Sequence, residues 1–330
     1  MENYIMKKAL LILMCCMAIQ SVHAQDTPKW ADKAKKAVFS IVTYDKENKI
    51  KNTGNGFYID NNGTALSDYS LFEDAERAVI INADGKELPV TRIAGANSMY
   101  DVIKFRTETE KKITALKVAT QPAAVGETVY LLPYSTQKAA TCQTGKVTQV
   151  DTIADKAYYY TLTMTTSDKT VSCPIMNANG EVLGLIQKSA SEEDKESYAI
   201  GASYGESLSI SPLSANDINL NKIGIAKALP ETEDQALVYL YMSSSQMDAK
   251  NYLATLNDFL QAYPNSTEGY TRRAGYYMNI GDDEHNALAE ADLKKAMDVS
   301  GNKTEGQYNV AKIIYSYCIN LEEGKKAYGD

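Results

Sequence analysis

The chain has 330 residues, of which 44% are hydrophobic and 23% are charged, and its formal net charge at pH 7 is −8. This length is sufficient for two domains of ordinary size. An acidic chain without a basic tract is a poor binder of nucleic acid or of anionic lipid, so we expect neither class of partner.

The first 24 residues have the pattern of a cleavable signal peptide. Lys7 and Lys8 form a basic start, an apolar run extends over Ala9–Ile19, and Val22–Ala24 is a small-x-small cleavage pattern. The apolar run is short for a bilayer span, which disfavours a membrane anchor. Lipoprotein processing at Cys15 or Cys16 is also disfavoured, because it requires a small residue before the cysteine. Met14 precedes Cys15, and Cys15 precedes Cys16. We expect cleavage after residue 24, export to the periplasm or beyond, and no membrane span in the mature chain.

Cleavage would leave three cysteines, Cys142, Cys173 and Cys318, and a net charge of −9. An odd number of cysteines is not a complete disulfide framework. Cys142 and Cys173 fall in the same half of the chain and are a possible disulfide in an oxidising compartment. Sequence spacing alone does not place two side chains within bridging distance.

The chain from residue 37 to about residue 204 consists of short runs rich in β-forming residues. Turn signals separate these runs, for example DNNG at 60–63 and NANG at 177–180. Many short strands at regular spacing predict an all-β barrel or sandwich, which we assign to residues 25–210. The predicted strands are Val38–Thr43, Gly56–Ile59, Ala78–Ile81, Asp101–Phe105, Thr128–Leu132, Lys146–Val150, Tyr158–Met164, Val182–Gln187 and Tyr198–Ile200.

Helical spacing of apolar residues replaces the strand pattern after about Pro212. The sequence STEGYTRRA at 266–274 recurs as KTEGQYNVA at 303–311, an offset of 37 residues. A repeat that spans a pair of helices is typical of a helical solenoid. We therefore predict a linker over residues 211–231 and a helical repeat domain over residues 232–330.

The repeat resembles the tetratricopeptide repeat, whose usual period is about 34 residues. The three extra residues fall between Gly281 and Ala289, which predicts a longer loop between the two helices. His285 lies in this polar stretch, and we expect it to be a solvated loop residue. A generic helical bundle is the alternative. The residues that fit the repeat are Tyr270, Ala274 and Tyr277 in the first helix and Ala289, Leu293 and Ala296 in the second.

Four stretches of the β-rich half resemble trypsin-like serine proteases of the bacterial HtrA type. Residues 52–75, NTGNGFYIDNNGTALSDYSLFEDA, resemble the family's G-x-G-F-x-I, turn, L-T-N-x-H-V. Residues 83–107, 141–150 and 173–187 resemble three later blocks of the family in the same order. The resemblance implies two six-stranded β-barrels with a cleft between them.

The resemblance also indicates where a catalytic triad would lie. A serine protease needs a hydroxyl nucleophile, an imidazole to take its proton and a carboxylate to orient the imidazole. The family's histidine falls on Ser70, its aspartate on Asp101 and, counting back from Pro174, its nucleophile on Val171. We therefore expect no catalytic residue. Asp101 is instead expected to accept hydrogen bonds, from Ser70 or from backbone N–H groups.

A shifted register is the alternative interpretation of this loop. The family's oxyanion-hole glycine falls on Lys169, and the glycines after the nucleophile become Ser172 and Cys173. Ser172 or Cys173 is then the fallback nucleophile, and Lys169 is conceivable as a base if it is buried. The only histidines are His23 and His285, so a nucleophile in the β-rich half would have no nearby imidazole in sequence.

The sequence has too few Cys and His residues, and no close spacing of them, to predict a metal site. It also has no glycine-rich phosphate loop, so we expect no cofactor. The chain is interpreted as an exported, catalytically inactive trypsin-like domain that binds protein or peptide partners through its cleft and its helical repeats. An active exported peptidase that uses Ser172 or Cys173 is the alternative, and a purely structural envelope protein is the third. The oligomeric state stays open.

Overall fold

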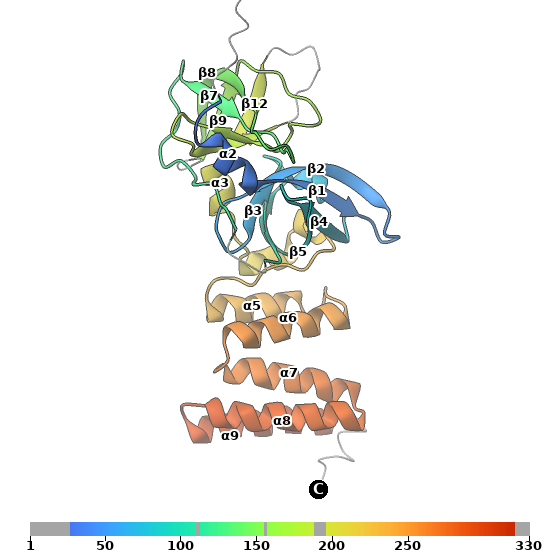
Figure 1. The fold of residues 1–330 in the computed structure, drawn as a ribbon. Coiled ribbons are helices and arrows are strands. Elements are labelled where there is room, and N and C mark those ends of the chain that lie inside the picture. Colours follow the sequence, from blue (N-terminus) through green and yellow to red (C-terminus); the bar gives the residue numbers. More distant parts are fainter. Residues whose placement is uncertain (1–26, 110–112, 155–156, 188–195, 321–330) are drawn as a thin grey trace, which may run out of the picture.

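The structure is a computed structural model that describes residues 27–109, 113–154, 157–187 and 196–320. The predicted signal peptide, residues 1–24, lies outside the described residues. Figure 1 shows two β-barrels followed by a stack of helices at the C-terminal end of the described chain. The predicted architecture, a double β-barrel followed by a helical array, is therefore confirmed.

The first barrel (barrel 1) is closed, with strand order β1-β2-β3-β6-β5-β4. Two short helices, α2 (Ala31–Ala34) and η1 (Lys35–Ala37), lead into it. Its core contains Phe39, Phe57, Phe72 and Phe105, all fully buried, and burial of each ring contributes about 1.5–3 kcal/mol. The strands are β1 (Val38–Tyr44), β2 (Ile50–Tyr58), β3 (Thr64–Ser67), β4 (Arg77–Ile81), β5 (Glu87–Asn97) and β6 (Val102–Thr107).

The second barrel (barrel 2) is also closed, with strand order β10-β11-β12-β9-β8-β7. The turn between β10 and β11 is held from the N-terminal side, because Trp30 Nε1 donates a hydrogen bond to Ala178 O at 3.0 Å. The strands are β7 (Thr128–Leu131), β8 (Gln143–Ala154), β9 (Ala157–Leu162), β10 (Pro174–Met176), β11 (Val182–Ile186) and β12 (Ser197–Gly201). The predicted pair of six-stranded barrels is confirmed.

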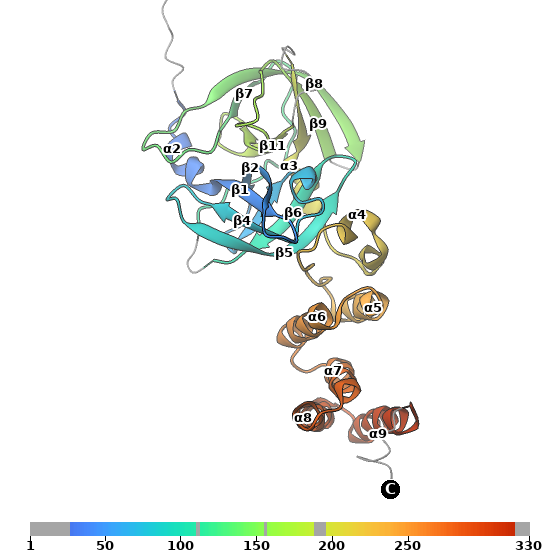
Figure 2. The same ribbon diagram turned by 90° about the vertical axis from the view of Figure 1, so that its right-hand side faces the viewer.

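Residues 211–231, predicted as a linker, are packed against barrel 1, and we call them the strap. After α3 (Ala202–Ser207), the strap contains η3 (Pro212–Asn216) and α4 (Ile218–Asn221). It bonds to β5 on both sides of Ile93, whose N–H donates to Ala226 O at 2.8 Å and whose carbonyl accepts from Ala228 N at 2.7 Å. Figure 2 shows α4 between barrel 1 and the helices that follow. The segment differs from a free linker because several of its apolar side chains, including Leu220 and Ile223, are buried in the barrel core.

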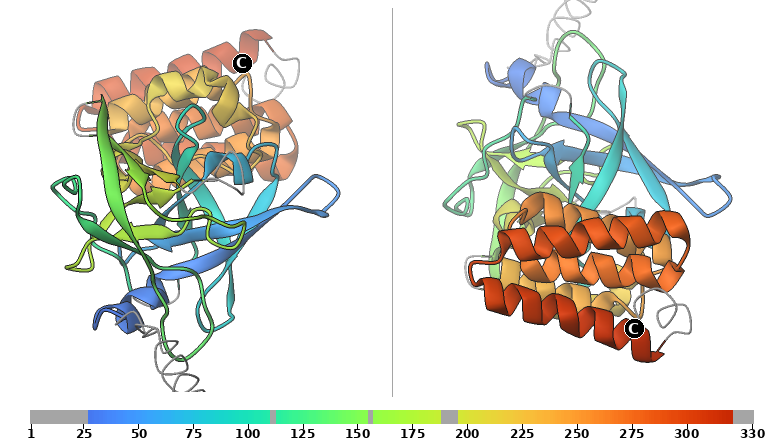
Figure 3. Two further views of the ribbon diagram at one scale, coloured as in Figure 1. Left: turned by 90° about the horizontal axis from the view of Figure 1, so that it is seen from above. Right: turned by 90° about the horizontal axis from the view of Figure 1, so that it is seen from below.

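Five helices form the array: α5 (Glu233–Ser243), α6 (Ala249–Ala262), α7 (Thr267–Ile280), α8 (Asp283–Val299) and α9 (Lys303–Asn320). Seen from below in Figure 3, these helices lie side by side across the end of the molecule. Ala274 and Tyr277 of α7 pack against Ala289, Leu293 and Ala296 of α8 in one buried cluster. Among the described residues, the structure contains no helix with both the length and the apolar character of a membrane span.

The predicted long loop between α7 and α8 is wrong. Gly281, in the left-handed conformation with φ of 77°, ends α7, and α8 begins two residues later. The Asp282 carboxylate caps α8 by accepting from the backbone N–H of His285 at 2.8 Å. The extra residues of the repeat therefore lengthen α8 to 17 residues. His285 lies in the first turn of this helix and not in a loop, with its Nδ1 at 2.7 Å from the Asp282 carboxylate.

Candidate functional site

The barrel-1 half of the candidate site pairs Ser70 with Asp101. Ser70 lies in η2 (Tyr69–Leu71), and Asp101 lies in the turn before β6. The Ser70 backbone N–H donates to Asp101 Oδ1 at 2.7 Å, and the Ser70 hydroxyl donates to Asp101 Oδ2 at 3.0 Å. Both oxygens of the carboxylate are thus engaged by Ser70, the residue that the sequence resemblance aligns with the family's histidine.

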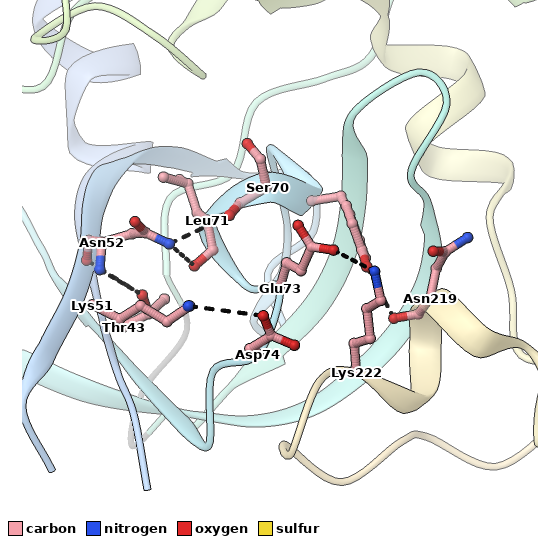
Figure 4. Close-up of polar contacts among 10 residues, drawn as sticks. Thr43, Lys51, Asn52, Ser70, Leu71, Glu73, Asp74, Asn219 and Lys222 are labelled. Carbon is pink, nitrogen blue, oxygen red and sulfur yellow. Dashed lines mark hydrogen bonds and ion pairs between the residues drawn. The ribbon is translucent and has the colours of Figure 1, made fainter. Parts of the chain in front are cut away.

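The short helix that carries Ser70 is held from two sides (Figure 4). On one side the amide of Asn52, from β2, donates to the carbonyls of Ser70 and Leu71 at 3.4 and 3.2 Å. On the other side Glu73 forms an ion pair with Lys222 of the strap at 2.7 Å. Contacts with β2 and with the strap therefore fix the position of Ser70.

The barrel-2 half of the candidate site is the loop 167–173. The backbone N–H of Val171 donates to Ser167 O at 3.2 Å, inside the same loop. The N–H of Ser172 donates to Ile186 O at 2.9 Å, at the end of β11. An oxyanion hole requires backbone N–H groups directed at the reacting atom. In this loop the N–H at the nucleophile position is already bonded to a carbonyl.

Ser172 is fully buried and has a φ of 64°, in the left-handed region that favours glycine. Its hydroxyl lies beside Asp68, but neither Ser172 Oγ nor Asp68 Oδ1 has a hydrogen bond of normal geometry to any described residue. The side chain of Lys169, the conceivable base in this loop, is exposed. The hydroxyl of Ser172 is therefore inaccessible, and Lys169 is not a buried amine.

Cys142 and Cys173 do not form a disulfide in the structure. Cys173 is fully buried, and this burial raises the pKa of its thiol to about 12. Burial also raises the pKa of the Cys142 thiol to about 11, with a smaller contribution from Asp32. Since the thiolate is the nucleophilic form of cysteine, Cys173 is poorly suited to attack a substrate.

Two buried polar residues beneath the cleft were missed by the sequence analysis. Asn55, only 5% exposed, donates from its amide to Lys169 O at 3.1 Å and to Val171 O at 2.8 Å. It lies on β2, so it ties barrel 1 to the loop of barrel 2. The signal was its place in the block NTGNGF, which was used only for the resemblance to the family.

Asp68, the second of these residues, is 2% exposed and lies two residues before Ser70. Its pKa is raised well above the usual value, first by burial and then by the negative charge of Asp101, while the nearby Ser172 hydroxyl lowers it. The signal was an acidic residue where the family motif L-T-N-x-H-V has a neutral amide. A carboxyl in such surroundings favours its protonated form.

The described residues include no group of three or more His, Cys, Asp and Glu side chains that could hold a metal ion. A pocket of about 250 Å³ lies between barrel 1 and the strap, lined in part by Lys104, Arg106 and Glu231. None of the triad-equivalent positions lines it. This pocket is therefore separate from the candidate site, which is defined by its hydrogen bonds.

Two closed six-stranded barrels joined in this way fit a chymotrypsin fold. Residues 54–185 match the family described as "Trypsin-like peptidase domain". The match extends from β2 to β11 and so includes both halves of the candidate site. No curated protein matches the chain.

Proposed function

We propose that this protein is an exported, catalytically inactive trypsin-like protein that binds polypeptide partners. The hydrogen bonds from Ser70 to both oxygens of Asp101 carry the proposal. A serine protease uses this carboxylate to orient an imidazole and to stabilise its charged form. Here a hydroxyl and its own backbone N–H occupy the carboxylate instead, and residues 27–231 contain no histidine.

The barrel-2 side supports the same function. Val171, at the position of the nucleophile, has an aliphatic side chain and no group that could attack a carbonyl. Ser172 and Cys173, the fallback nucleophiles, are fully buried, and the thiol of Cys173 has a raised pKa. Neither fallback nucleophile is therefore accessible to a substrate carbonyl.

The proposed binding surfaces are the barrel cleft and the helical array. A cleft between barrels can bind an extended chain by strand addition, and helical repeats of the tetratricopeptide kind present broad surfaces for peptides. Tyr241, Tyr308 and Tyr315 of the array are 69%, 66% and 66% exposed. Tyrosine is enriched in protein interfaces because its ring buries a large area and its hydroxyl forms a hydrogen bond.

The decisive test of inactivity uses the chain without residues 1–24. It is incubated with unfolded casein and, separately, with a fluorophosphonate probe, with trypsin as the positive control. We expect no casein turnover and no labelling. Turnover that disappears in Ser172→Ala or in Cys173→Ala would overturn the proposal and establish the active peptidase instead.

Export and binding have separate tests. N-terminal sequencing of the chain recovered from an envelope fraction is expected to begin at Gln25, and an intact Met1 would contradict export. Cross-linking and pull-down from an envelope extract are expected to recover a reproducible protein partner. Recovery of none would favour a purely structural envelope protein.

A further inference from the structure

One side chain crosses between the two barrels directly beside the candidate site. Gln187 follows Ile186, the last residue of β11, which bonds to both Ser172 and Cys173. Tyr100 immediately precedes Asp101. Gln187 therefore follows a residue bonded to the barrel-2 half of the candidate site, and Tyr100 precedes a residue of the barrel-1 half.

The carboxamide of Gln187 uses both of its polar ends in this crossing. Its Nε2 donates to Tyr100 O of barrel 1 at 2.7 Å. Its Oε1 accepts from the hydroxyl of Tyr159, in β9 of barrel 2, at 2.6 Å. The backbone N–H of Gln187 is separately bonded to Tyr198 O at 2.8 Å, so the main chain is anchored and the side chain alone makes the bridge.

The three tyrosines bonded to Gln187, namely Tyr100, Tyr159 and Tyr198, take part in two ring pairs. Tyr159 and Tyr198 are stacked with ring centroids 6.1 Å apart, and Tyr100 and Tyr204 meet edge to face at 5.4 Å. A tyrosine hydroxyl is protonated at neutral pH, and burial, and then Tyr198, raise the pKa of Tyr159 further. Hydrogen bonds in such partly desolvated, aromatic surroundings are stronger than in water.

The chemistry of the bridge indicates what else fits there. A carboxamide is the same planar donor–acceptor group as a peptide bond. The Tyr100 carbonyl and the Tyr159 hydroxyl are one acceptor and one donor, both neutral, which suits an amide better than an ion. We propose that they form a subsite for one backbone amide of an extended polypeptide, and that the protein's own Gln187 occupies this subsite until a ligand displaces it.

This inference rests on the proposed function and specifies its regulation. A peptide that enters the cleft replaces the Gln187 amide with its own, and the tyrosine rings favour an apolar or aromatic side chain next to the bound amide. Because the bridge and the ligand compete for the same partners, the self-occupied state lowers the apparent affinity of the cleft.

The main test measures binding of fluorescein-labelled unfolded casein by fluorescence polarisation. The chain without residues 1–24 is compared with its Gln187→Ala variant. Removing the competing amide is expected to tighten binding about 2- to 10-fold, which corresponds to about 0.4–1.4 kcal/mol. Gln149→Ala is the matched control, since Gln149 lies in the same barrel and its side chain, within the described part of the chain, bonds to the exposed Asp151. Unchanged or weaker binding in Gln187→Ala would overturn the proposal.

A second variant identifies the donor of the subsite. Tyr159→Phe keeps the ring stack but removes the hydroxyl that serves both Gln187 and the ligand, so its affinity is expected to stay within about twofold of the original. The double variant Gln187→Ala/Tyr159→Phe is expected to bind about 2- to 10-fold more weakly than Gln187→Ala alone. Equal affinity of Gln187→Ala and of the double variant would exclude Tyr159 from the subsite and contradict the inference.

Hydrogen exchange without ligand separates the bridge from the function. Gln187→Ala is expected to speed amide exchange in residues 97–101, the turn that the bridge holds, and Gln149→Ala is not. Unchanged exchange in Gln187→Ala means that the bridge does not hold the turn. This result overturns the inference regardless of the affinity measured for casein. If exchange rises but casein binds to none of the variants, the result supports the bridge between the barrels. It contradicts both the peptide-binding function and the proposed ligand of the subsite.

Discussion

The barrel-1 and barrel-2 halves of the candidate site differ in how their polar groups are bonded. On the barrel-1 side, Asp101 accepts a backbone N–H and a side-chain hydroxyl from Ser70, so the contact between the two positions is intact. On the barrel-2 side, the N–H of Val171 bonds within its own loop, and Ser172 is buried. The Ser70–Asp101 contact stabilises the folded chain, whereas the N–H groups of Val171 and Ser172 are bonded to carbonyls and are not free to bind an oxyanion.

The largest expected effect tests how strongly the two sides depend on each other. Asn55→Ala removes the amide that bonds to the carbonyls of Lys169 and Val171. We expect a loss of about 2–4 kcal/mol in the free energy of unfolding, because two carbonyls lose their partner at a buried position. Urea denaturation measures it. The control Asn61→Ala changes an exposed asparagine, and an equal loss there would show that Asn55 has no special role.

A change of the opposite sign is expected at Asp68. The pKa of its carboxyl is raised in the folded chain, so its favourable contribution is complete below the usual carboxyl pKa of about 3.9 and is lost as the pH rises through the raised value. At pH 8 Asp68→Asn should therefore stabilise the protein by about 1–3 kcal/mol, by removing the cost of a buried unpaired charge.

Unfolding curves between pH 4 and pH 8 check this expectation at Asp68. The stabilisation by Asp68→Asn should shrink as the pH falls, while Asp84→Asn, at an exposed turn, should have no comparable pH-dependent effect. A stabilisation that stays constant with pH would contradict the raised pKa.

The backbone of the barrel-2 loop allows a smaller test. Ser172→Gly is expected to stabilise the protein by about 1 kcal/mol, since glycine adopts a positive φ without strain and the substitution removes an unpaired buried hydroxyl. The thermal midpoint reports the change. Ser167→Gly, in the same loop at an ordinary φ, should instead destabilise the protein. The same sign in both variants would mean that the conformation of residue 172 carries no cost.

The smallest effect is expected on the barrel-1 side. Ser70→Ala removes one hydrogen bond to Asp101 but leaves the bond from the backbone N–H. At this exposed position the loss should be about 0.5 kcal/mol, at the low end for a hydrogen bond. Ser98→Ala, an exposed serine near the same turn, is the control in urea denaturation. A loss above 2 kcal/mol would show that the Ser70 hydroxyl, and not its backbone N–H, is the main source of the contact with Asp101.

The fold was largely predictable because motifs and turn signals mark the barrels. The strand β5 was missed, since Pro89 and Gly95 interrupt its pattern, yet it runs over 11 residues. Gly95 is needed there because a Cβ at this position would lie 2.8 Å from the backbone nitrogen of Ser209, which packs against it. The packing of the strap on barrel 1 was not foreseen for a related reason, since it depends on a tertiary contact with Ile93 that no local pattern encodes.

The candidate site was predictable only where the family motif names a position. Ser70, Asp101 and Val171 follow from the motif, whereas the roles of Asn55, Asp68 and Gln187 depend on contacts between the barrels. Each of these three side chains is polar, and each acts on a partner that lies at least 30 residues away or across the cleft. A sequence pattern reports local periodicity, so such long-range pairs are not visible in it.

The strap also sets how the two proposed binding surfaces cooperate. It is packed on barrel 1, and beyond it Arg92 of β5 pairs with Asp258 of α6 while the Tyr263 hydroxyl donates to Glu231 O at 3.0 Å. Packing, and not the reach of a flexible tether, therefore sets the spacing between the cleft and the array. A partner that contacts both surfaces gains from a high effective concentration once its first segment is bound. It does so only if the distance between its two binding segments matches the spacing of the two surfaces. Avidity in this protein would thus select partners by the distance between their two binding segments.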